Sequence, residues 1–252
     1  MCSIGVIAPH RPQRGLVGFL TMEDTVVIPL PAPPKLRTSV IVDYQNVHLV
    51  GHEAFSSTRN LPRHESLVDP LLFAEQLLKC RNAAQGPGYQ HATLGRILVF
   101  RGLPSSEYEP DANARSLAQQ AHWQRDRRVQ ITLRPLRYII ERGADGRALL
   151  DVNGKATVVE KREKGVDVLC ALALVREAAR PDTDLVILAS HDTDLAPALD
   201  AVCESQDAKV EAFRWDSSDW YVNRLKSDVR NVWCTRLDER AFEASRDHTP
   251  YV

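Results

Sequence analysis

The 252-residue sequence predicts one α/β domain, a Rossmann-like parallel sheet flanked by helices, and three observations support this fold class. Short apolar runs alternate with segments of helical spacing, as in consecutive βαβ units. The length leaves room for one such domain with extensions. Hydrophobic residues make up 44% and charged residues 26% of the chain, which is ordinary for a globular domain.

The first half of the domain is predicted from apolar runs and leucine spacing. The β-branched run 39–43 predicts a strand that ends at an aspartate, and leucines at near-helical intervals predict a helix over 66–81. A Gly-Pro-Gly loop at 86–88 separates this helix from a second strand at 97–100. A polar helix is predicted over 111–126.

The middle of the chain predicts a third strand and an insert. The stretch 129–140 has strand composition and is interrupted by Pro135, which cannot donate a ladder hydrogen bond. The segment 141–160 is a long insert, and Asp145-Gly146 and Asn153-Gly154 predict turns within it.

The alternation continues to residue 213. An apolar helix is predicted over 165–180, where Pro181 ends it. A fourth strand at 185–189, a helix at 195–205 and a fifth strand at 210–213 follow.

Three segments describe the expected domain organisation. Residues 1–37 contain four prolines between positions 29 and 34 and are expected to form an extension or linker, with 26–28 as an edge strand. The main folded domain is expected over 38–215, and residues 216–252 are expected to pack on it as a helical extension.

Composition narrows the class of protein. No apolar run approaches the roughly 20 residues that span a bilayer, and polar residues interrupt the N-terminal apolar stretch, which argues against a secretory signal. The five cysteines lack CxxC spacing, so we expect neither a zinc site nor a disulfide framework, and a reducing cytoplasm is the expected location. The net charge of −1 gives no overall field for nucleic acid.

Acidic residues at the ends of apolar segments are the candidate site. Asp43 ends the first strand, Asp192 and Asp194 follow the fourth, and Asp167 begins the apolar helix. Side chains at the carboxyl ends of parallel strands converge on one crevice. Carboxylates gathered there repel one another unless a cation lies between them, and oxygen ligands suit Mg²⁺ or Mn²⁺. The pattern predicts metal-dependent cleavage of a phosphodiester.

Each of these residues has a structural alternative. Asp194 is also expected as the N-cap of the helix that contains Pro197, with Asp192 as a turn residue. Asp43 and Asn46 fit an Asx turn equally well, although Asn46 is also placed to orient Asp43 or a phosphate. Asp167 is predicted to be a buried carboxylate that binds a metal, and the alternatives are pairing with an arginine or a partly solvated position in the first turn, which the helix dipole favours.

Other polar residues are weaker candidates. Glu163 lies four residues before Asp167 and is a second-choice ligand. The histidines are expected to be structural more often than catalytic; they are His48, His52 and His191. Lys161, Arg162 and Lys164 precede Asp167 and are expected to hold phosphates, with a solvated face as the alternative and the arginines between 125 and 137 as a second basic region.

Three segments together resemble a known family. Residues 42–47, VDYQNV, resemble the opening D-x-x-N of NYN domains, a branch of the PIN-like ribonucleases. Residues 163–168, EKGVDV, look like the K-G-V-D helix start of that family, and residues 188–197, LASHDTDLAP, look like its S-G-D-x-D-F-x-P turn. The three motifs occur in family order across about residues 38–215.

The resemblance implies a PIN-like fold and Mg²⁺- or Mn²⁺-dependent cleavage of RNA. Under it, four aspartates match the acidic positions: Asp43, Asp167, Asp192 and Asp194. Asn46 matches the asparagine, and Ser190 matches the hydroxyl beside the site, where RNA binds. The chain departs from the motifs at His191, where the family has glycine, at Leu195, where it has phenylalanine, and at Ala173, where many members have a further aspartate.

The leading hypothesis is therefore an endoribonuclease that cleaves single-stranded RNA at the aspartate cluster. The alternative is a catalytically weak module of the same fold that binds RNA or a protein partner, which the missing carboxylate at Ala173 favours. A phosphatase or Toprim-like enzyme is a third interpretation, but Toprim chemistry requires a glutamate where this chain has Asp43. The sequence leaves open whether the protein forms a homodimer.

Overall fold

The computed structural model describes residues 34–56, 61–152 and 154–251. The chain divides into two units, Met1–Ala32 and Pro33–Val252, and every described residue belongs to the second. The predicted edge strand at 26–28 and nearly all of the predicted linker at 1–37 lie outside the described residues. The predicted domain start at residue 38 is slightly late, because the first strand already begins at Leu36.

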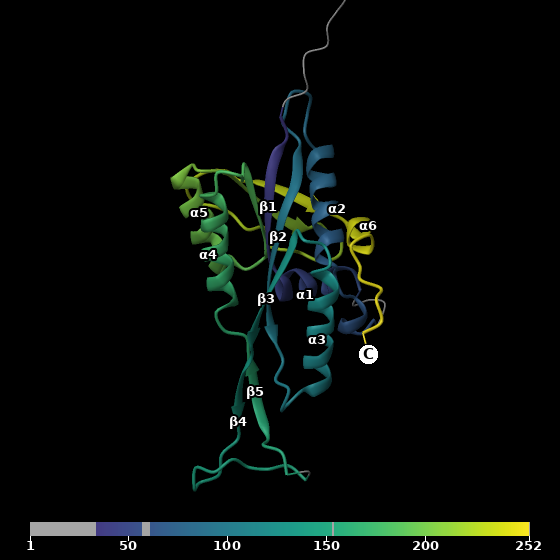
Figure 1. The fold of residues 1–252 in the computed structure, drawn as a ribbon, viewed down its shortest axis with the longest axis vertical. Helices are drawn as coiled ribbons and strands as arrows, with labels where there is room; N and C mark the ends of the chain where they lie inside the picture. Colours follow the sequence, from purple (N-terminus) through teal and green to yellow (C-terminus); the bar gives the residue numbers. More distant parts are fainter. Residues whose placement is uncertain (1–33, 57–60, 153, 252) are drawn as a thin grey trace, which may run out of the picture. The chain divides into compact units, whose positions relative to one another are not determined.

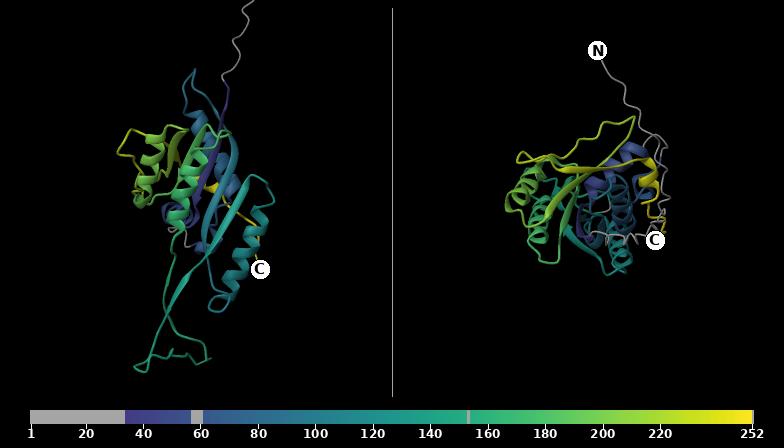
Figure 2. Two further views of the ribbon diagram at one scale, coloured as in Figure 1. Left: turned by 60° about the vertical axis from the view of Figure 1, so that its left-hand side comes forward. Right: turned by 90° about the horizontal axis from the view of Figure 1, so that it is seen from above.

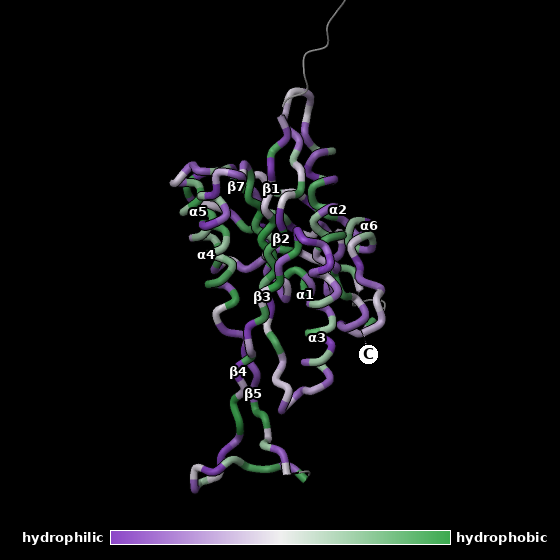
Figure 3. The backbone as a smooth tube through the Cα atoms, in the orientation of Figure 1, coloured by the Kyte–Doolittle hydropathy of each residue, from purple (hydrophilic) through white to green (hydrophobic). Residues whose placement is uncertain are grey.

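A parallel sheet in the order β3-β2-β1-β6-β7-β8 forms the centre of the fold, which confirms the predicted α/β class (Figure 1). The six strands are β1 (Leu36–Asp43), β2 (Ala92–Leu103), β3 (Val129–Pro135), β6 (Leu185–Ala189), β7 (Lys209–Trp215) and β8 (Trp233–Leu237). β6 is buried at every residue, as expected for a parallel strand covered on both faces. Figure 3 shows this apolar character along the central strands.

Helices cover both faces of the sheet (Figures 1 and 2). The helices are α1 (Tyr44–Phe55), α2 (Pro70–Ala83), α3 (Pro110–Trp123), α4 (Val166–Ala178), α5 (Ala196–Ser205) and α6 (Glu239–Glu243), with 3₁₀ turns at Arg63–Glu65 and Thr193–Leu195. α4 and α5 bury one core against the sheet, with Leu174 and Leu199 at its centre. The other core lies under α1, α2 and α6 and includes Phe73 and Trp215.

The strand order creates a switch point between β1 and β6. From β1 the chain builds the sheet outward through β2 to β3, then crosses to β6 on the other side of β1 and continues outward through β7 to β8. In open α/β sheets, ligands bind in the crevice at the carboxyl ends of the strands where the order reverses. The crevice of this protein is therefore expected between the turns that follow β1 and β6.

The prediction of one interrupted strand over 129–140 was wrong. β3 ends at Pro135, and the chain continues as β4 (Arg137–Ile140), which pairs antiparallel with β5 (Val158–Arg162) in a separate two-stranded arm (Figures 1 and 2). The reason is that β2 ends at Leu103, whose carbonyl accepts the last hydrogen bond, from Leu136 N. Beyond that point the chain has no sheet neighbour and pairs with its own return segment. The predicted turns fit the positive φ of Gly146 and Gly154, 76° and 74°.

The prediction that 216–252 is a helical extension also needs correction. The tail does pack on the domain, but it supplies the sixth strand, β8, and only a five-residue helix, α6. β8 pairs with β7 from Glu211 to Trp215, so the domain boundary expected at residue 215 falls between two strands of one sheet. Alternating burial along β8 identifies it as an edge strand with one face on the core.

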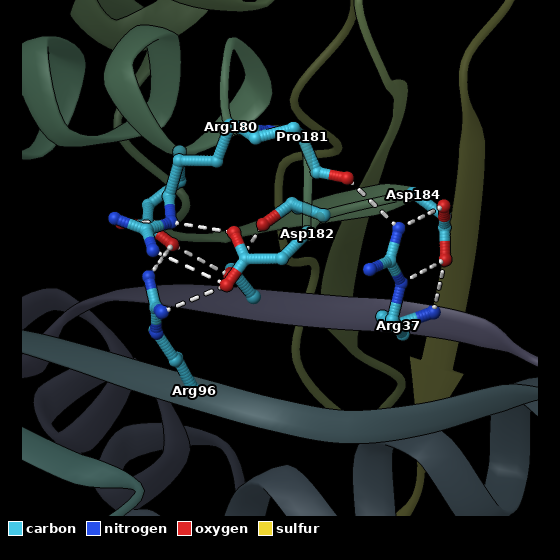
Figure 4. A network of polar contacts seen from close by, with 9 residues as sticks. Arg37, Arg96, Arg180, Pro181, Asp182 and Asp184 are labelled. Carbon is cyan, nitrogen blue, oxygen red and sulfur yellow. Dashed lines mark hydrogen bonds and ion pairs between the residues drawn. The ribbon is translucent and has the colours of Figure 1, made fainter.

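The amino end of the sheet is closed by arginine–aspartate pairs (Figure 4). Arg37 at the start of β1 donates to both carboxylate oxygens of Asp184, with Nε–Oδ2 at 2.9 Å and Nη2–Oδ1 at 3.0 Å. Arg96 and Arg180 both donate to Asp182. These pairs connect the starts of β1, β2 and β6 and leave the carboxyl end as the edge with the predicted site.

Two further expectations concern the class of protein. Within the described residues, no helix is long and apolar enough to cross a membrane. The four described cysteines are free thiols; they are Cys80, Cys170, Cys203 and Cys234.

Candidate functional site

The turn after β1 carries Asp43, which is 3% exposed. Asp43 is the N-cap of α1, and its Oδ1 accepts a hydrogen bond from Asn46 N at 3.3 Å. Its other oxygen, Oδ2, accepts from Ser190 Oγ at 2.9 Å, and Ser190 lies after β6. The predicted Asx turn is therefore present, but the second hydrogen bond joins Asp43 across the switch point.

Asn46 makes the second connection between the two turns. Its side-chain Oδ1 accepts from His191 N at 2.8 Å. Asn46 was expected to orient Asp43 or a phosphate. Only its backbone N–H contacts Asp43, to which it donates, and its side chain accepts from the turn after β6. Ser190 Oγ also accepts from Asp192 N at 3.0 Å, so the position of Asp192 depends on the same contacts.

Asp192 rather than Asp194 is the cap after β6, which corrects the sequence interpretation. Asp192 Oδ1 accepts from Asp194 N at 3.0 Å and begins the 3₁₀ turn Thr193–Leu195. α5 starts only at Ala196, with Pro197 in its first two positions, where no backbone donor is required. Asp194 is consequently an exposed side chain that is free of capping.

Asp167 lies in the first turn of α4 and is exposed, so the prediction of a buried carboxylate was wrong. The helix is not buried all round: Val168 is 60% and Leu172 52% exposed. Gly165, before the helix, has φ of 79°, and an added Cβ would lie 3.0 Å from Arg134 Nε. This position requires glycine, which explains the glycine before Val166 in physical terms.

Glu163 is more central than the sequence predicted. Its Oε2 accepts from Gly102 N at 2.6 Å, which brings a carboxylate from the segment before α4 to the end of β2. An added Cβ at Gly102 would collide with this carboxylate and with Leu136. The absence of a side chain at Gly102 is therefore what lets Glu163 reach the carboxyl edge.

The pKa values show that these carboxyl groups share one environment. Burial raises the pKa of Asp43 to about 7, hydrogen bonds from Ser190 and Asn46 oppose the rise, and the charges of Glu163 and Asp167 add to it. The pKa of Glu163 is raised by burial and further by Asp167. The pKa of Asp167 is raised by partial burial and then by Asp192 and Asp194. The carboxylates from four segments are thus close enough to repel one another.

The donor chemistry fits Mg²⁺ or Mn²⁺, although the ligand set is not preassembled. Within the described residues, no group of three or more His, Cys, Asp or Glu side chains lies close enough to hold a metal ion. Mg²⁺ is commonly held by one or two carboxylates together with water and substrate phosphate oxygens. Asp43 and Asp192 offer such a pair of carboxylates, because Ser190 Oγ contacts the Asp43 carboxylate and the Asp192 backbone N–H. Further oxygen donors at the same edge are Asp167, Asp194 and Glu163.

The predicted phosphate-binding residues lie on or beside β5, and two of them are already paired. Lys161 Nζ is 2.7 Å from Glu109 Oε1, and Arg162 pairs with Glu160. Lys164 is exposed at the amino end of α4, and its carbonyl accepts from Arg134 Nε at 2.7 Å. Lys164 is therefore the member of the group with the best access to a phosphate.

The histidines have structural surroundings. His48 Nε2 lies 2.9 Å from Arg63 O, and His52 Nδ1 lies 2.8 Å from Ser66 Oγ. Burial lowers the pKa of His48 and of His191 to about 4. The pKa of His52 is also lowered by burial, so the three residues keep neutral rings.

Arg101 is a site residue that sequence reasoning missed. Its guanidinium lies 4.7 Å from the centre of the Tyr44 ring, and its charge lowers the pKa of Glu163. Arg101 precedes Gly102 near the end of β2, so it brings a cation to an otherwise acidic edge. An arginine inside a strand gives no sequence signal of this role, because its position depends on the register between β1 and β2.

Comparisons with known proteins add little to this geometry. No protein-family model and no curated protein matches the chain. One solved structure that is similar belongs to a protein of unknown function from Vibrio parahaemolyticus, at 20% sequence identity, covering 73% of this chain and 84% of that chain with a TM-score of 0.39.

Proposed function

We propose that the protein is a metal-dependent endoribonuclease that cleaves single-stranded RNA at the carboxyl edge of its sheet. The observation that carries this proposal is the hydrogen bond between Ser190 Oγ and Asp43 Oδ2, 2.9 Å long, because it joins the two strand ends that flank the switch point. Four further carboxylates belong to the same edge, Glu163, Asp167, Asp192 and Asp194, and the mutual repulsion of these groups favours a cation among them.

The residues of the edge would have distinct tasks in this reaction. Asp43 and Asp192 would hold Mg²⁺ or Mn²⁺, with Asp167, Asp194 and Glu163 as further oxygen donors or as groups that orient water. When bound, such an ion activates water and neutralises charge that develops on the phosphate. Ser190 and Asn46 would fix the two turns, because each bonds across the switch point.

The substrate would be held mainly through its phosphates. The amino end of α4 offers backbone N–H groups and a helix dipole that favour an anion, and Lys164 lies directly before it. Phosphate contacts position RNA but carry little sequence information. We therefore propose cleavage without strong base preference, in the cytoplasmic compartment that the cysteine pattern favours.

A cleavage assay tests the proposal. Purified protein is incubated with a mixed panel of single-stranded RNAs in Mn²⁺, in Mg²⁺ and in EDTA, and the same panel is given to Asp192→Asn. Asp207→Asn is the matched control, because Asp207 is exposed and lies before β7, at the opposite end of the sheet. We expect metal-dependent products with wild type and with the control only. Equal cleavage by Asp192→Asn at saturating Mn²⁺ would contradict the assignment.

A specific observation favours a second candidate, an RNA- or partner-binding module with weak activity. Ala173 is 2% exposed and packs in the core beneath α4, so this helix turn supplies no further carboxylate. Within the described residues the acidic side chains also do not form a ready three-ligand group. RNA binding without metal-dependent cleavage in the same assay would support this candidate over the first.

A further inference from the structure

A second charged region lies two strands away from the acidic site. A cavity of about 670 Å³ opens beside the edge strand β8, between that strand and the segment 221–226. Four cationic side chains line it, and its lining contains no carboxylate: the cations are Arg214, Arg224, Lys226 and Arg236. This concentration of positive charge contrasts with the net charge of −1 of the chain.

Three of these side chains, the arginines, lie close to one another. Arg214 on β7 and Arg236 on β8 are register partners, so both side chains leave the same face of the sheet. Both of them, together with Arg224, lie near enough to lower the pKa of the Cys234 thiol, against the larger effect of burial, which raises it. Like charges at neighbouring strand positions are destabilising. An anion in the cavity would relieve that repulsion.

Local partners satisfy only part of this charge. Asp216 pairs with Arg214, and Arg224 donates to Val232 O at 2.7 Å, a neutral acceptor. In the part of the chain that the structure describes, neither Lys226 nor Arg236 forms an ion pair, and both are exposed. These two cations are therefore available to a ligand.

Two aromatic side chains border the same cavity. Tyr221 is 84% and Trp233 45% exposed, although large aromatic groups normally contribute to a core. Exposed aromatic rings beside cations form the platform on which single-stranded nucleic acids stack their bases while the cations hold the backbone. An acidic peptide would use the cations but would leave these ring faces without a matching partner.

The cavity is within reach of the proposed cleavage site. Arg214 is the penultimate residue of β7, and Phe213, the residue before it, packs on His191 with the two ring centres 4.9 Å apart. His191 lies between Ser190 and Asp192 at the end of β6. Neighbouring strands are about 4.8 Å apart, so β8 lies roughly 10 Å from β6 across β7. A short single-stranded segment spans this distance.

We propose that the β8 cavity is a second RNA-binding site, which holds a nucleotide of the substrate a short distance from the acidic site. Lys226 and Arg236 contact the phosphates, and Tyr221 and Trp233 stack on the base. The inference rests on the proposed function in that it takes the same RNA as ligand. It adds a determinant of affinity that is separate from the carboxylates.

The test uses the full chain in an Asp192→Asn background, so that binding is measured without cleavage. A labelled oligoribonucleotide is titrated at several salt concentrations against this protein with and without Lys226→Glu and Arg236→Glu. Loss of two phosphate contacts is expected to weaken binding about tenfold and to reduce the log–log salt slope by roughly 1.4. Arg230→Glu is the matched control: this exposed arginine is in the same loop but does not line the cavity.

Two outcomes separate this inference from the proposed function. If RNA binds and the double variant binds it equally well with the same slope, the second site is wrong while the nuclease proposal stands. If the parent protein binds no RNA, both proposals are wrong.

A separate experiment adds unlabelled uridine monophosphate as competitor. Complete displacement of the oligonucleotide at similar concentrations would make the cavity a mononucleotide site and overturn the proposal. Quenching of Trp233 fluorescence by the oligonucleotide, lost in Trp233→Phe, would support stacking.

Discussion

The two ends of the central sheet carry similar acidic residues in opposite electrostatic states. At the amino end, hydrogen bonds from Arg37 lower the pKa of Asp184 to about 2. At the carboxyl end, burial raises the pKa of Asp43 to about 7, and neighbouring carboxylates add to the rise. Both aspartates lie at strand ends, on β1 and just before β6, so the difference comes from their neighbours and not from the strands. Figure 4 shows the Arg37 guanidinium against the Asp184 carboxylate.

This difference indicates which end is structural and which is functional. Ion pairs such as Arg37–Asp184 connect the first residues of neighbouring strands and leave little net charge at the amino end. The carboxyl edge keeps Glu163, Asp167 and Asp43 within mutual repulsion, an arrangement that does not help folding in the absence of a cation. Carboxyl groups with raised pKa values that converge on a crevice are typical of functional sites.

The largest expected contrast comes from neutralising one aspartate at each end. Asp43→Asn should reduce metal-dependent cleavage by more than about 100-fold, because it removes the charge of a proposed metal ligand. Loss of a residue that only orients a metal ligand typically reduces activity by about 10–100-fold. Asp184→Asn should not change the cleavage rate at room temperature. It should lower thermal stability only slightly, since exposed ion pairs contribute little. Initial rates on one RNA and melting curves of both variants measure this. Equal rates for the two variants would break the distinction between the ends.

The two aspartates should also give opposite pH dependences of stability in EDTA. The pKa of Asp43 is raised in the folded protein, so folding takes up a proton, and its contribution to the free energy of unfolding falls as pH rises from about 4 to 7, by at most about 4 kcal/mol. The pKa of Asp184 is lowered, so its contribution is present above about pH 4 and is lost as pH falls toward 2.

Urea unfolding between pH 3 and 8 checks these signs. Asp43→Asn should flatten the curve between pH 4 and 7, while Asp184→Asn should change it only below about pH 4. A wild-type curve that rises through pH 4 to 7 and is unaltered by Asp43→Asn would show that Asp43 is ionised in the folded protein.

Two glycines on β2 allow the carboxyl and amino ends of the sheet to be compared by substitution at the backbone. Gly102→Ala collides with the Glu163 carboxylate at the carboxyl end, whereas Gly95→Ala approaches Thr38 O to 3.2 Å at the amino end. Both substitutions should destabilise the protein by about 1–3 kcal/mol through overpacking. Only Gly102→Ala should also reduce cleavage, about tenfold, because Glu163 loses its place. Rates measured well below both melting temperatures separate the two effects, and equal loss with Gly95→Ala would assign Glu163 a purely structural role.

Much of the sheet could be predicted from the sequence, because period, turn residues and apolar runs report local structure. The strands near 39–43 and 185–189, and the aspartates that follow them, lie where these patterns indicated. The sixth strand could not be predicted: Trp233–Leu237 is short and mixed in polarity, and it becomes a strand only because β7 offers a free edge. The arm has the same cause, since β4 pairs where β2 ends.

The candidate site was predictable in its carboxylates but not in its contacts. The positions of Asp43 and Asp192 follow from strand ends, whereas Ser190 to Asp43 and Asn46 to His191 are contacts across more than 140 residues. The exposure of Asp167 depends on which face of α4 the sheet covers, which an all-apolar helix does not reveal. In the basic cluster, the partner of Lys161, Glu109, is also a long-range contact, whereas the partner of Arg162, Glu160, is only two residues away.

The smallest expected effect concerns that basic cluster, Lys161, Arg162 and Lys164. Two of its cations already have carboxylate partners, Glu109 and Glu160, so they are expected to release few counterions when RNA binds. Lys164→Glu alone should therefore reproduce nearly the whole effect of reversing all three, a decrease of roughly 0.7 in the log–log salt slope of single-stranded RNA binding. The titration is done in Ca²⁺ to suppress cleavage, with Arg230→Glu as the control at the amino end, where its side chain lines a hollow beside Asp184. A decrease in slope about three times as large in the triple variant as in Lys164→Glu would mean that Lys161 and Arg162 break their ion pairs and bind RNA. An unchanged slope in both would place the phosphates away from α4, at the β8 cavity.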